Sequence, residues 1–189
     1  MTVAAAVDRA GAVRVAVRRL VAARGFHGAS MSAIAREAGV ATGTAYVHYA
    51  SKDELVLAAY VESKLELGRA ATAALAPDDA PEQLFRTLWL AAYRHLAGSP
   101  AAAAFLLQVD DSPYAERAHA LMMERDDDPL ALVADARAIA ARLRALPPEV
   151  LYELGIAPAV RLAARRIELT DEQLEQVAGA CWRAISRPA

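Results

Sequence analysis

Apolar residues recur at helical spacing along most of the chain, and no segment shows the clear alternation of apolar and polar residues typical of a strand. Between residues 8 and 24, for example, Val13, Val17, Leu20 and Val21 fall on one face of a helix. Alanine supplies much of the apolar content and favours closely packed helices. The pattern predicts an all-α protein with about nine helices.

Capping residues divide residues 25–55 into three short segments. Ser30 is placed to cap a helix over 30–38, which Gly39 ends because a residue without Cβ enters the left-handed conformation at little cost. A second helix is expected over 42–49. Two short helices joined by a tight glycine turn are typical of a helix-turn-helix, whose second helix lies in the major groove of DNA.

The third segment opens a much longer helix. Ser51 and Glu54 have the spacing of a capping box and predict a helix to about residue 74. At 1.5 Å per residue it would be about 35 Å long, enough to leave a small N-terminal unit and enter the rest of the protein.

Prolines behind capping residues mark the later helices. A break at 75–80 precedes Pro81, and Ser99-Pro100, Ser112-Pro113 and Asp128-Pro129 each place a capping residue before a proline at a first helical position. The expected helices are 81–96, 100–109, 113–124, 129–146, 148–168 with an interruption near Gly155 or Pro158, and 171–186 behind a capping box of Thr170 and Gln173. Asp126, Asp127 and Asp128 are interpreted as favourable charges at a helix N-terminus rather than a calcium site, because no EF-hand spacing follows.

The charge is divided unevenly along the chain. Residues 1–55 hold seven Lys/Arg against four Asp/Glu, a net charge of +3, and the remainder holds 14 against 19, a net charge of −5. A basic N-terminal part on an acidic body suits binding of a polyanion at one end. Arg14, Arg18 and Arg19 lie mostly away from the apolar face of the first helix, so they are expected to be solvated or to lie near phosphate.

The remaining composition is that of an ordinary globular protein, with 56% apolar and 23% charged residues. The single cysteine, Cys181, excludes an internal disulfide and a cysteine zinc cluster. The N-terminus lacks the basic n-region of a secretory signal, and the longest uncharged stretch is too short to span a bilayer. We therefore expect a cytoplasmic protein without a membrane partner.

Residues 25–55 resemble the DNA-binding domain of TetR-family regulators. The matching positions are Gly25, Phe26, Ser30, Ile34, Ala35, Ala38, Gly39, Val40, Gly43, Thr44, Tyr46, His48, Tyr49, Ser51, Lys52 and Leu55. The resemblance implies a helix-turn-helix DNA-binding domain over 1–52, here called the head. It also implies a helical effector-binding and dimerisation domain over 53–189, here called the body.

The resemblance also implies which residues contact DNA. They are Ser30, Ser32, Thr42, Gly43, Thr44, Tyr46, His48 and Lys52. Tyr49 matches a buried aromatic residue of the family and is expected in the core. Ala41 stands where a capping serine is usual, so Thr42 is expected to cap the second helix instead. Thr42 itself stands where Lys or Arg is frequent, which makes guanine readout by a long basic side chain unexpected.

In the body, the resemblance implies a homodimer and a pocket for a small-molecule effector. The predicted dimer residues are Leu151, Leu162, Leu174, Val177, Cys181, Trp182 and Ile185 on the last two helices, with ordinary core packing as the alternative. The predicted effector residues are Tyr60, Trp89, Tyr93, Phe105, Gln108, Tyr114, His119 and Met122, for each of which core packing is the alternative. The few charges in these helices favour a mostly apolar effector, which would release a repressor from its operator DNA.

An enzyme and a helical ligand carrier are the two competing classes of protein. The four histidines show no metal-ligand spacing, Cys181 has no neighbouring base, and no glycine-rich loop follows a strand, so we expect no catalytic residue, metal or cofactor. A helical ligand carrier whose head no longer binds DNA stays open, because Ala41 and Thr42 depart from the family pattern.

Overall fold

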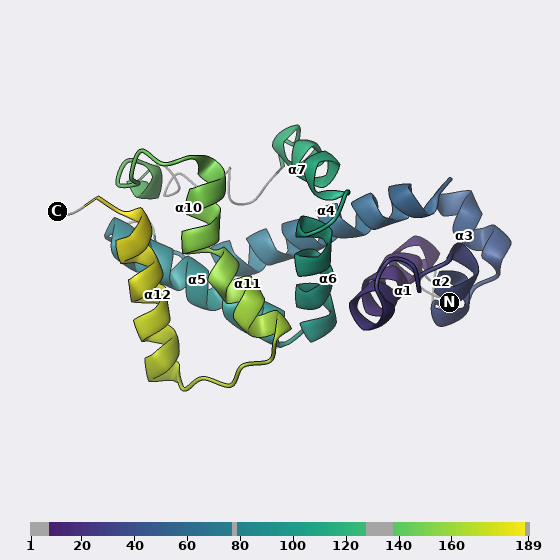
Figure 1. Cartoon of the computed structure of the whole chain (residues 1–189), viewed down its shortest axis with the longest axis horizontal. Helices are drawn as coiled ribbons and strands as arrows, with labels where there is room; N and C mark the ends of the chain where they lie inside the picture. Colours follow the sequence, from purple (N-terminus) through teal and green to yellow (C-terminus); the bar gives the residue numbers. More distant parts are fainter. Residues whose placement is uncertain (1–7, 77–78, 128–137, 188–189) are drawn as a thin grey trace, which may run out of the picture.

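The computed structural model describes residues 8–76, 79–127 and 138–187, and these form the helices α1 to α7 and α10 to α12 (Figure 1). Three helices build the head: α1 (Arg9–Arg24), α2 (Met31–Glu37) and α3 (Thr42–His48). The long α4 (Lys52–Thr72) starts beside α3 and runs from the head into the body. No strand occurs in the described ranges, so the all-α prediction is confirmed.

The ends of the head helices follow from their capping residues. The Ser30 side chain accepts a hydrogen bond from the Ala33 N–H at 3.2 Å, and Gly39 ends the α2 segment with a φ of +69°. Ser51 accepts from the Glu54 N–H at 3.1 Å, while the Glu54 carboxylate accepts from Ala50 rather than from Ser51. The second half of this capping box is therefore displaced by one residue.

The predicted role of Thr42 as a cap is wrong. Helix α3 begins at Thr42 itself, and the N-cap is Ala41, which makes no side-chain capping bond. The helix is held instead by burial of Ala45 and by the turn that precedes it.

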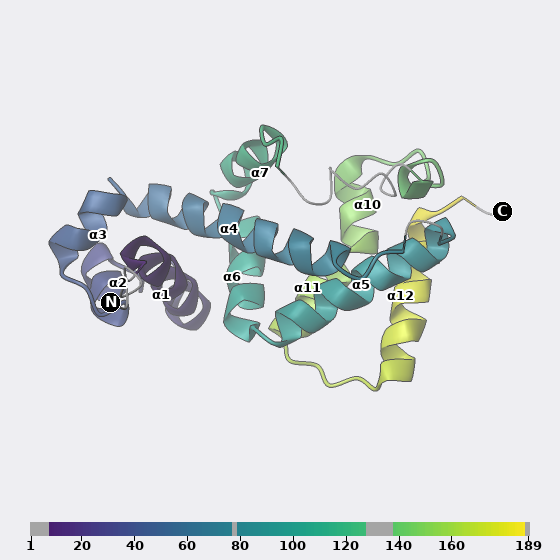
Figure 2. The same cartoon turned by 180° about the vertical axis from the view of Figure 1, so that it is seen from behind.

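The body packs against α4 along much of its length. Its helices are α5 (Pro81–Ala97), α6 (Pro100–Asp110), α7 (Ala115–Met123), α10 (Pro148–Gly155), α11 (Ala157–Ala164) and α12 (Asp171–Ile185). Helix α5 packs along α4, and α10, α11 and α12 form a layer on one side of α5, here called the C-terminal layer. This layer lies in front of α5 in Figure 1 and behind it in Figure 2.

Several predicted boundaries in the body need correction. The start of the helix expected over 129–146 lies outside the described residues, and 141–146 are not helical because Leu143 forms an antiparallel bridge with Ser186. The helix expected over 148–168 is divided at Ile156, as predicted, but it ends at Ala164, where Arg166 takes a positive φ. The capping box of Thr170 and Gln173 is confirmed.

The core of the body is built around large side chains of α5 and α12. Trp89 is fully buried, and its Nε1–H donates to the Gly155 carbonyl at 3.1 Å. The rings of Phe85 and Trp182 lie 5.5 Å apart. A Cβ on Gly155 would come within 3.2 Å of Ile185, so the absence of a side chain there allows α10 to pack closely on α12.

Within the described residues, no helix combines the length and the apolar character that crossing a membrane requires.

Candidate nucleic-acid interface

Buried apolar side chains hold the helix-turn-helix against α1. Ile34 and Ala35 of α2 and Ala45 of α3 are fully buried and belong to the same core cluster as Val13 and Val17 of α1. Tyr49, directly after α3, is also buried, which confirms its predicted place in the core. Because the inner face of α3 is anchored in this way, its opposite face is directed to solvent.

The exposed face of α3 carries most of the residues predicted to contact DNA. Thr42, Gly43 and His48 are exposed, and 51% of the Tyr46 surface is accessible. Nothing lies within 4 Å of the position a Cβ on Gly43 would take, so this part of α3 is open to close approach. Thr44 is only half-buried, at the edge of this face.

The sequence interpretation missed one residue of this face. Val47 is 82% exposed between Tyr46 and His48. Ala45, which the sequence placed at the exposed front of this helix, is fully buried, and Tyr49 is buried as expected; Val47 lies two residues from each and therefore on the opposite side of the helix.

Ser30, Ser32 and Lys52 flank α3. Ser30 and Ser32 are exposed at the start of α2, and their hydroxyl oxygens lie 3.1 Å apart. Lys52 Nζ donates to the Phe26 carbonyl at 3.0 Å, so its ammonium is held over the turn that precedes α2. The N-termini of α2 and α4 present backbone N–H groups beside these side chains, an arrangement that suits phosphate.

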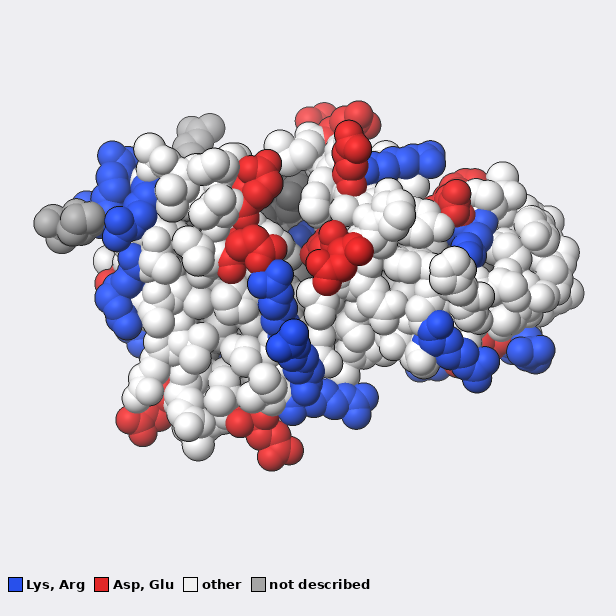
Figure 3. Space-filling model, viewed as in Figure 1, with Lys and Arg blue, Asp and Glu red and all other residues white. Residues whose placement is uncertain are grey.

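Helix α3 itself contains no Lys or Arg. Figure 3 shows the end of the head that carries α3 as a largely uncharged surface. Its polar groups are hydroxyls and an imidazole, which are chemically able to donate and accept hydrogen bonds without a fixed charge.

Two of the three α1 arginines considered in the sequence analysis do not face solvent as expected. Arg18 is buried, and its guanidinium lies 3.2 Å from Glu62 and 3.0 Å from Glu66 of α4. Arg14 lies 2.7 Å from Glu62, and this hydrogen bond, opposed by burial, raises the pKa of Arg14 above its ordinary value. The expectation of a solvated or phosphate-facing surface is therefore wrong for these two residues, which join α1 to α4. Arg19 is exposed, as expected.

Two predicted effector residues join the head to the body instead. The Tyr114 hydroxyl donates to Asp53 at 2.6 Å, and its ring lies 5.0 Å from the ring of Phe26. Burial, and then this hydrogen bond, raise the pKa of Tyr114 to about 12. Gln108 of α6 donates to the Ala22 carbonyl of α1 at 3.4 Å.

The other predicted effector residues are mostly packed core. Trp89, Phe105 and Tyr60 are fully buried, Tyr93 is buried, and Met122 is partly buried. Tyr60 and the exposed His119 both bond Asp110 of α6, at 3.2 and 3.1 Å, and Tyr152 of α10 bonds its other oxygen at 3.2 Å. Burial, and then the charge of Asp110, raise the pKa of Tyr60. This cluster was not foreseen, because its members come from four separate helices.

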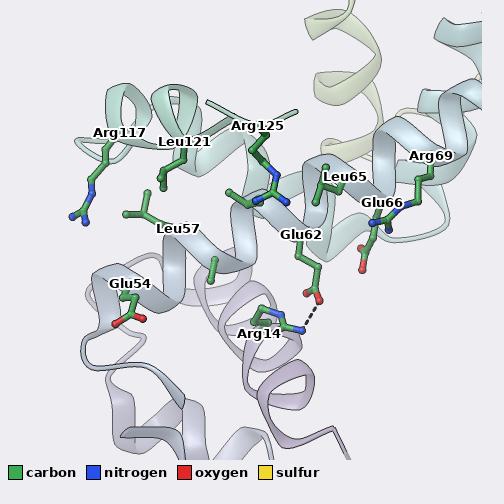
Figure 4. A pocket seen from close by; sticks show the side chains of 12 residues that line it. Arg14, Glu54, Leu57, Glu62, Leu65, Glu66, Arg69, Arg117, Leu121 and Arg125 are labelled. Atoms are coloured by element: carbon green, nitrogen blue, oxygen red, sulfur yellow. Dashed lines mark ion pairs between the residues drawn. The ribbon is translucent and has the colours of Figure 1, made fainter. Parts of the chain in front are cut away.

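A sizeable hollow of the described residues lies elsewhere. It is an open groove of about 710 Å³ between α1, α4 and α7, here called the junction groove (Figure 4). Its lining residues are Arg14, Glu54, Leu57, Ala58, Val61, Glu62, Leu65, Glu66, Arg69, Arg117, Leu121 and Arg125. None of the eight predicted effector residues lines it, and only Tyr93 lines a second, smaller hollow near the start of α6.

The predicted dimer residues divide into two groups. Leu174, Cys181, Trp182 and Ile185 are buried within the single chain, so they are core residues here, and the structure does not support a direct contact with a second copy for them. Burial also raises the pKa of the Cys181 thiol. Leu151, Leu162 and Val177 are partly exposed.

Comparison with known proteins matches the N-terminal and the C-terminal parts of the chain to the same family. Residues 13–59 match the family described as "Bacterial regulatory proteins, tetR family", and residues 81–186 match the tetracyclin repressor-like C-terminal domain. An HTH-type transcriptional regulator of Haemophilus influenzae is 28% identical over 187 residues, which cover 95% of this chain and 97% of that protein.

Solved structures of similar proteins superpose on nearly the whole of this chain. A TetR-family regulator from Haemophilus influenzae superposes with a TM-score of 0.77 at 25% identity and coverage of 95% and 97% of the two chains. One from a Shewanella species superposes with a TM-score of 0.79 at 25% identity and coverage of 95% and 99%. One from Marinobacter aquaeolei shares the fold, with a TM-score of 0.80 at 23% identity and coverage of 95% and 96%.

These matches run through the helix-turn-helix and through the helical body, and the family consists of transcription regulators rather than enzymes. The chain therefore belongs to the TetR family and is a transcriptional regulator with an N-terminal helix-turn-helix DNA-binding domain.

Proposed function

We propose that the protein is a homodimeric repressor that binds operator DNA through α3 and is released by a small, mostly apolar effector. The observation that carries the DNA-binding part is the outward face of α3. It presents Tyr46, Val47 and His48 beside the open Gly43, over a buried anchor at Ala45. A helix with small residues at its front fits a major groove about 12 Å wide.

The surrounding groups then contact the DNA backbone. Ser30 and Ser32, with the backbone N–H groups at the start of α2, bind one phosphate region, and Lys52 binds the next. Because α3 carries no formal charge, these contacts position the helix, and hydroxyl, imidazole and methyl groups read the bases. A DNA-binding role agrees with the expected cytoplasmic location.

The C-terminal layer is the proposed dimer surface. Val150 and Leu154, one helical turn apart on α10, are 39% and 42% exposed, and Val177 of α12 is partly exposed. Figure 3 shows much of this side of the body as uncharged. A second copy packed against this surface would bury the apolar stripe and hold two heads for successive major grooves, about 34–36 Å apart.

The position of α4 supports the proposed release of the protein from DNA by an effector. This one helix begins beside α3 and is packed against α1, α5, α6 and α7, so a shift of the body moves the head with it. An effector that prefers the displaced arrangement about 1,000-fold would favour it by roughly 4 kcal/mol.

A salt-titrated mobility shift tests this function. The DNA upstream of the protein's own gene is compared with a scrambled duplex, using wild-type protein and the double variant Tyr46→Ala/His48→Ala. We expect a specific complex whose affinity falls with salt, and loss of that complex in the variant while its circular dichroism and elution volume stay unchanged. A specific complex retained by the variant would contradict the role of α3. The absence of any salt-sensitive specific complex on this and other upstream regions would favour the ligand-carrier alternative.

A further inference from the structure

The junction groove combines an apolar floor with charged walls. Five apolar residues from two helices form the floor: Leu57, Ala58, Val61 and Leu65 of α4 and Leu121 of α7. Figure 4 shows Leu57 of α4 beneath Leu121 of α7, with Leu65 further along α4. Its volume of about 710 Å³ lies within the usual range for small-molecule sites, roughly 300–1,000 Å³.

The acidic groups of the groove are already engaged. Glu62 pairs with Arg14 at 2.7 Å and with Arg18 at 3.2 Å, and Glu66 pairs with Arg18 at 3.0 Å. Glu54 accepts the Ala50 N–H at 2.9 Å. A cationic ligand would therefore have to compete with the chain's own arginines and with a helix cap for each of these carboxylates.

The basic groups are engaged unequally. Arg125 forms two hydrogen bonds of 2.7 Å with Asp127. The pKa of Asp127 is lowered chiefly by its hydrogen bond with Arg125, and the charge of Arg69 is the smallest of the causes. Arg117 is exposed, and no residue of the described ranges forms an ion pair or hydrogen bond with its guanidinium.

We propose that the junction groove is the effector site and that it takes an amphipathic organic acid. The apolar chain of the ligand lies on the partly exposed Ala58, Val61 and Leu121, and its carboxylate binds the Arg117 guanidinium. Arg117 and Arg69 lie at opposite ends of the groove in Figure 4, so a carboxylate at Arg117 leaves the apolar floor free for the chain. Arginine suits this role, because its planar donors match a carboxylate. This assignment rests on the proposed function and replaces the aromatic set expected from the sequence.

The position of the groove explains how such a ligand would act. Its walls come from α1 of the head, from α7 of the body and from α4, which joins them. The wall residues Arg14 and Glu62 are themselves the ion pair between α1 and α4. A ligand that fills the space between α7 and α1 therefore favours one spacing of head and body over another, as release requires.

Calorimetric titration of the full chain with decanoate, below the concentration at which it forms micelles, tests the proposal. Decanol, which has the chain without the charge, and acetate, which has the charge without the chain, are the matched probes. We expect decanoate to bind with a negative heat-capacity change, decanol to bind at least tenfold more weakly, and acetate to give no measurable binding. Equal binding of decanol and decanoate, or no binding of decanoate, would overturn the proposed ligand class.

Three variants locate the site. Arg117→Gln should weaken decanoate binding about tenfold or more, since a charge-assisted hydrogen bond is lost. Leu121→Asn should also weaken it by placing a polar group in the floor. Arg69→Gln, at the opposite end of the groove, should change it less than threefold. Unchanged affinity in both Arg117→Gln and Leu121→Asn, or a loss confined to Arg69→Gln, would overturn the assignment. The salt-sensitive DNA complex is measured separately on the same preparations, so failure of decanoate binding and failure of DNA binding remain distinguishable.

Discussion

Arg18 of α1 and Glu66 of α4 meet at 3.0 Å, with the guanidinium buried and also bonded to the Ser63 hydroxyl. The same arginine lies 3.2 Å from Glu62. Because a buried guanidinium that leaves its carboxylates is costly, α1 and α4 are expected to move together. The head is thus tied to the helix that enters the body, and in the proposed mechanism this tie carries a change in the body to the DNA-binding surface.

We predict that Arg18→Met lowers the free energy of unfolding by about 1–3 kcal/mol, since it keeps much of the buried volume but removes the arginine partner of Glu66 and one of the two arginine partners of Glu62. Glu66 is partly exposed, so Glu66→Gln should cost less than about 1 kcal/mol. Arg19→Met, an exposed neighbour on the same helix, serves as the control and should stay within about 0.5 kcal/mol of wild type. Equal urea midpoints for Arg18→Met and Arg19→Met would contradict the role of the buried ion pairs.

Alkaline pH should loosen the contact between Tyr114 and Asp53. Burial, followed by the hydrogen bond to Asp53, raises the pKa of Tyr114 to about 12, whereas an unfolded tyrosine ionises near pH 10. Between these values the unfolded chain has lost a proton that the folded chain retains. The stabilisation is therefore complete below about pH 10 and disappears as pH rises through about 12.

The variant Tyr114→Phe should show a shallower loss of stability over this range than wild type. Part of the alkaline loss remains in the variant, because burial and the charge of Asp110 also raise the pKa of Tyr60 and Tyr152. Urea unfolding at a series of pH values, followed by circular dichroism, measures the two slopes. Parallel curves for the two proteins would show that Tyr114 does not carry the effect.

Val47 should contribute to operator sequence preference. Its exposed methyl groups on α3 suit contact with the C5-methyl of thymine, and Val47→Ala should weaken specific binding roughly tenfold, or about 1.4 kcal/mol. Met123→Ala, which shortens another exposed apolar residue on the body, should leave affinity unchanged. Replacing operator thymines one at a time with deoxyuracil should identify a position at which wild type loses affinity and Val47→Ala does not. If every position affects both proteins equally, Val47 does not read a methyl group.

Dimerisation should depend on the outward residues of the C-terminal layer. The double variant Val150→Lys/Leu154→Lys is expected to shift the protein toward monomer on size-exclusion chromatography while retaining its helical content. Substitution of Trp182 by arginine would instead place a charge in the core of one chain, since only 5% of this residue is exposed. A dimer that elutes unchanged in the Val150/Leu154 variant would exclude this surface.

Much of the fold follows from local signals, and most of the errors concern contacts between distant residues. Ser30, Ser51 and Thr170 cap helices as expected, because capping depends only on residues three positions away. Arg18 looks like a surface residue in sequence, and its partners Glu62 and Glu66 are more than forty positions distant. Trp182 lies on a continuous apolar face, but the pattern alone does not distinguish the core of one chain from a contact between two.

In the candidate site, too, local features could be predicted from the sequence and contacts between distant segments could not. The outward face of α3 could be predicted, and Val47 could have been included, because its exposure follows from helical periodicity. The junction groove could not, because α1, α4 and α7 meet only in the folded chain and its charges pair across helices. The aromatic residues chosen for an effector pocket are instead the side chains that fill the core best, as with Trp89 and Phe105.

Hydroxyl-radical footprinting of the protein on its operator tests most directly whether two heads, held by their bodies, read one face of the duplex through α3. We expect two protected tracts about one helical turn, or 10–10.5 base pairs, apart on one side of the DNA, with two protein chains bound per site. Both tracts should vanish together in Tyr46→Ala/His48→Ala. A single protected tract, a complex containing one chain, or full protection by the double variant would contradict the account.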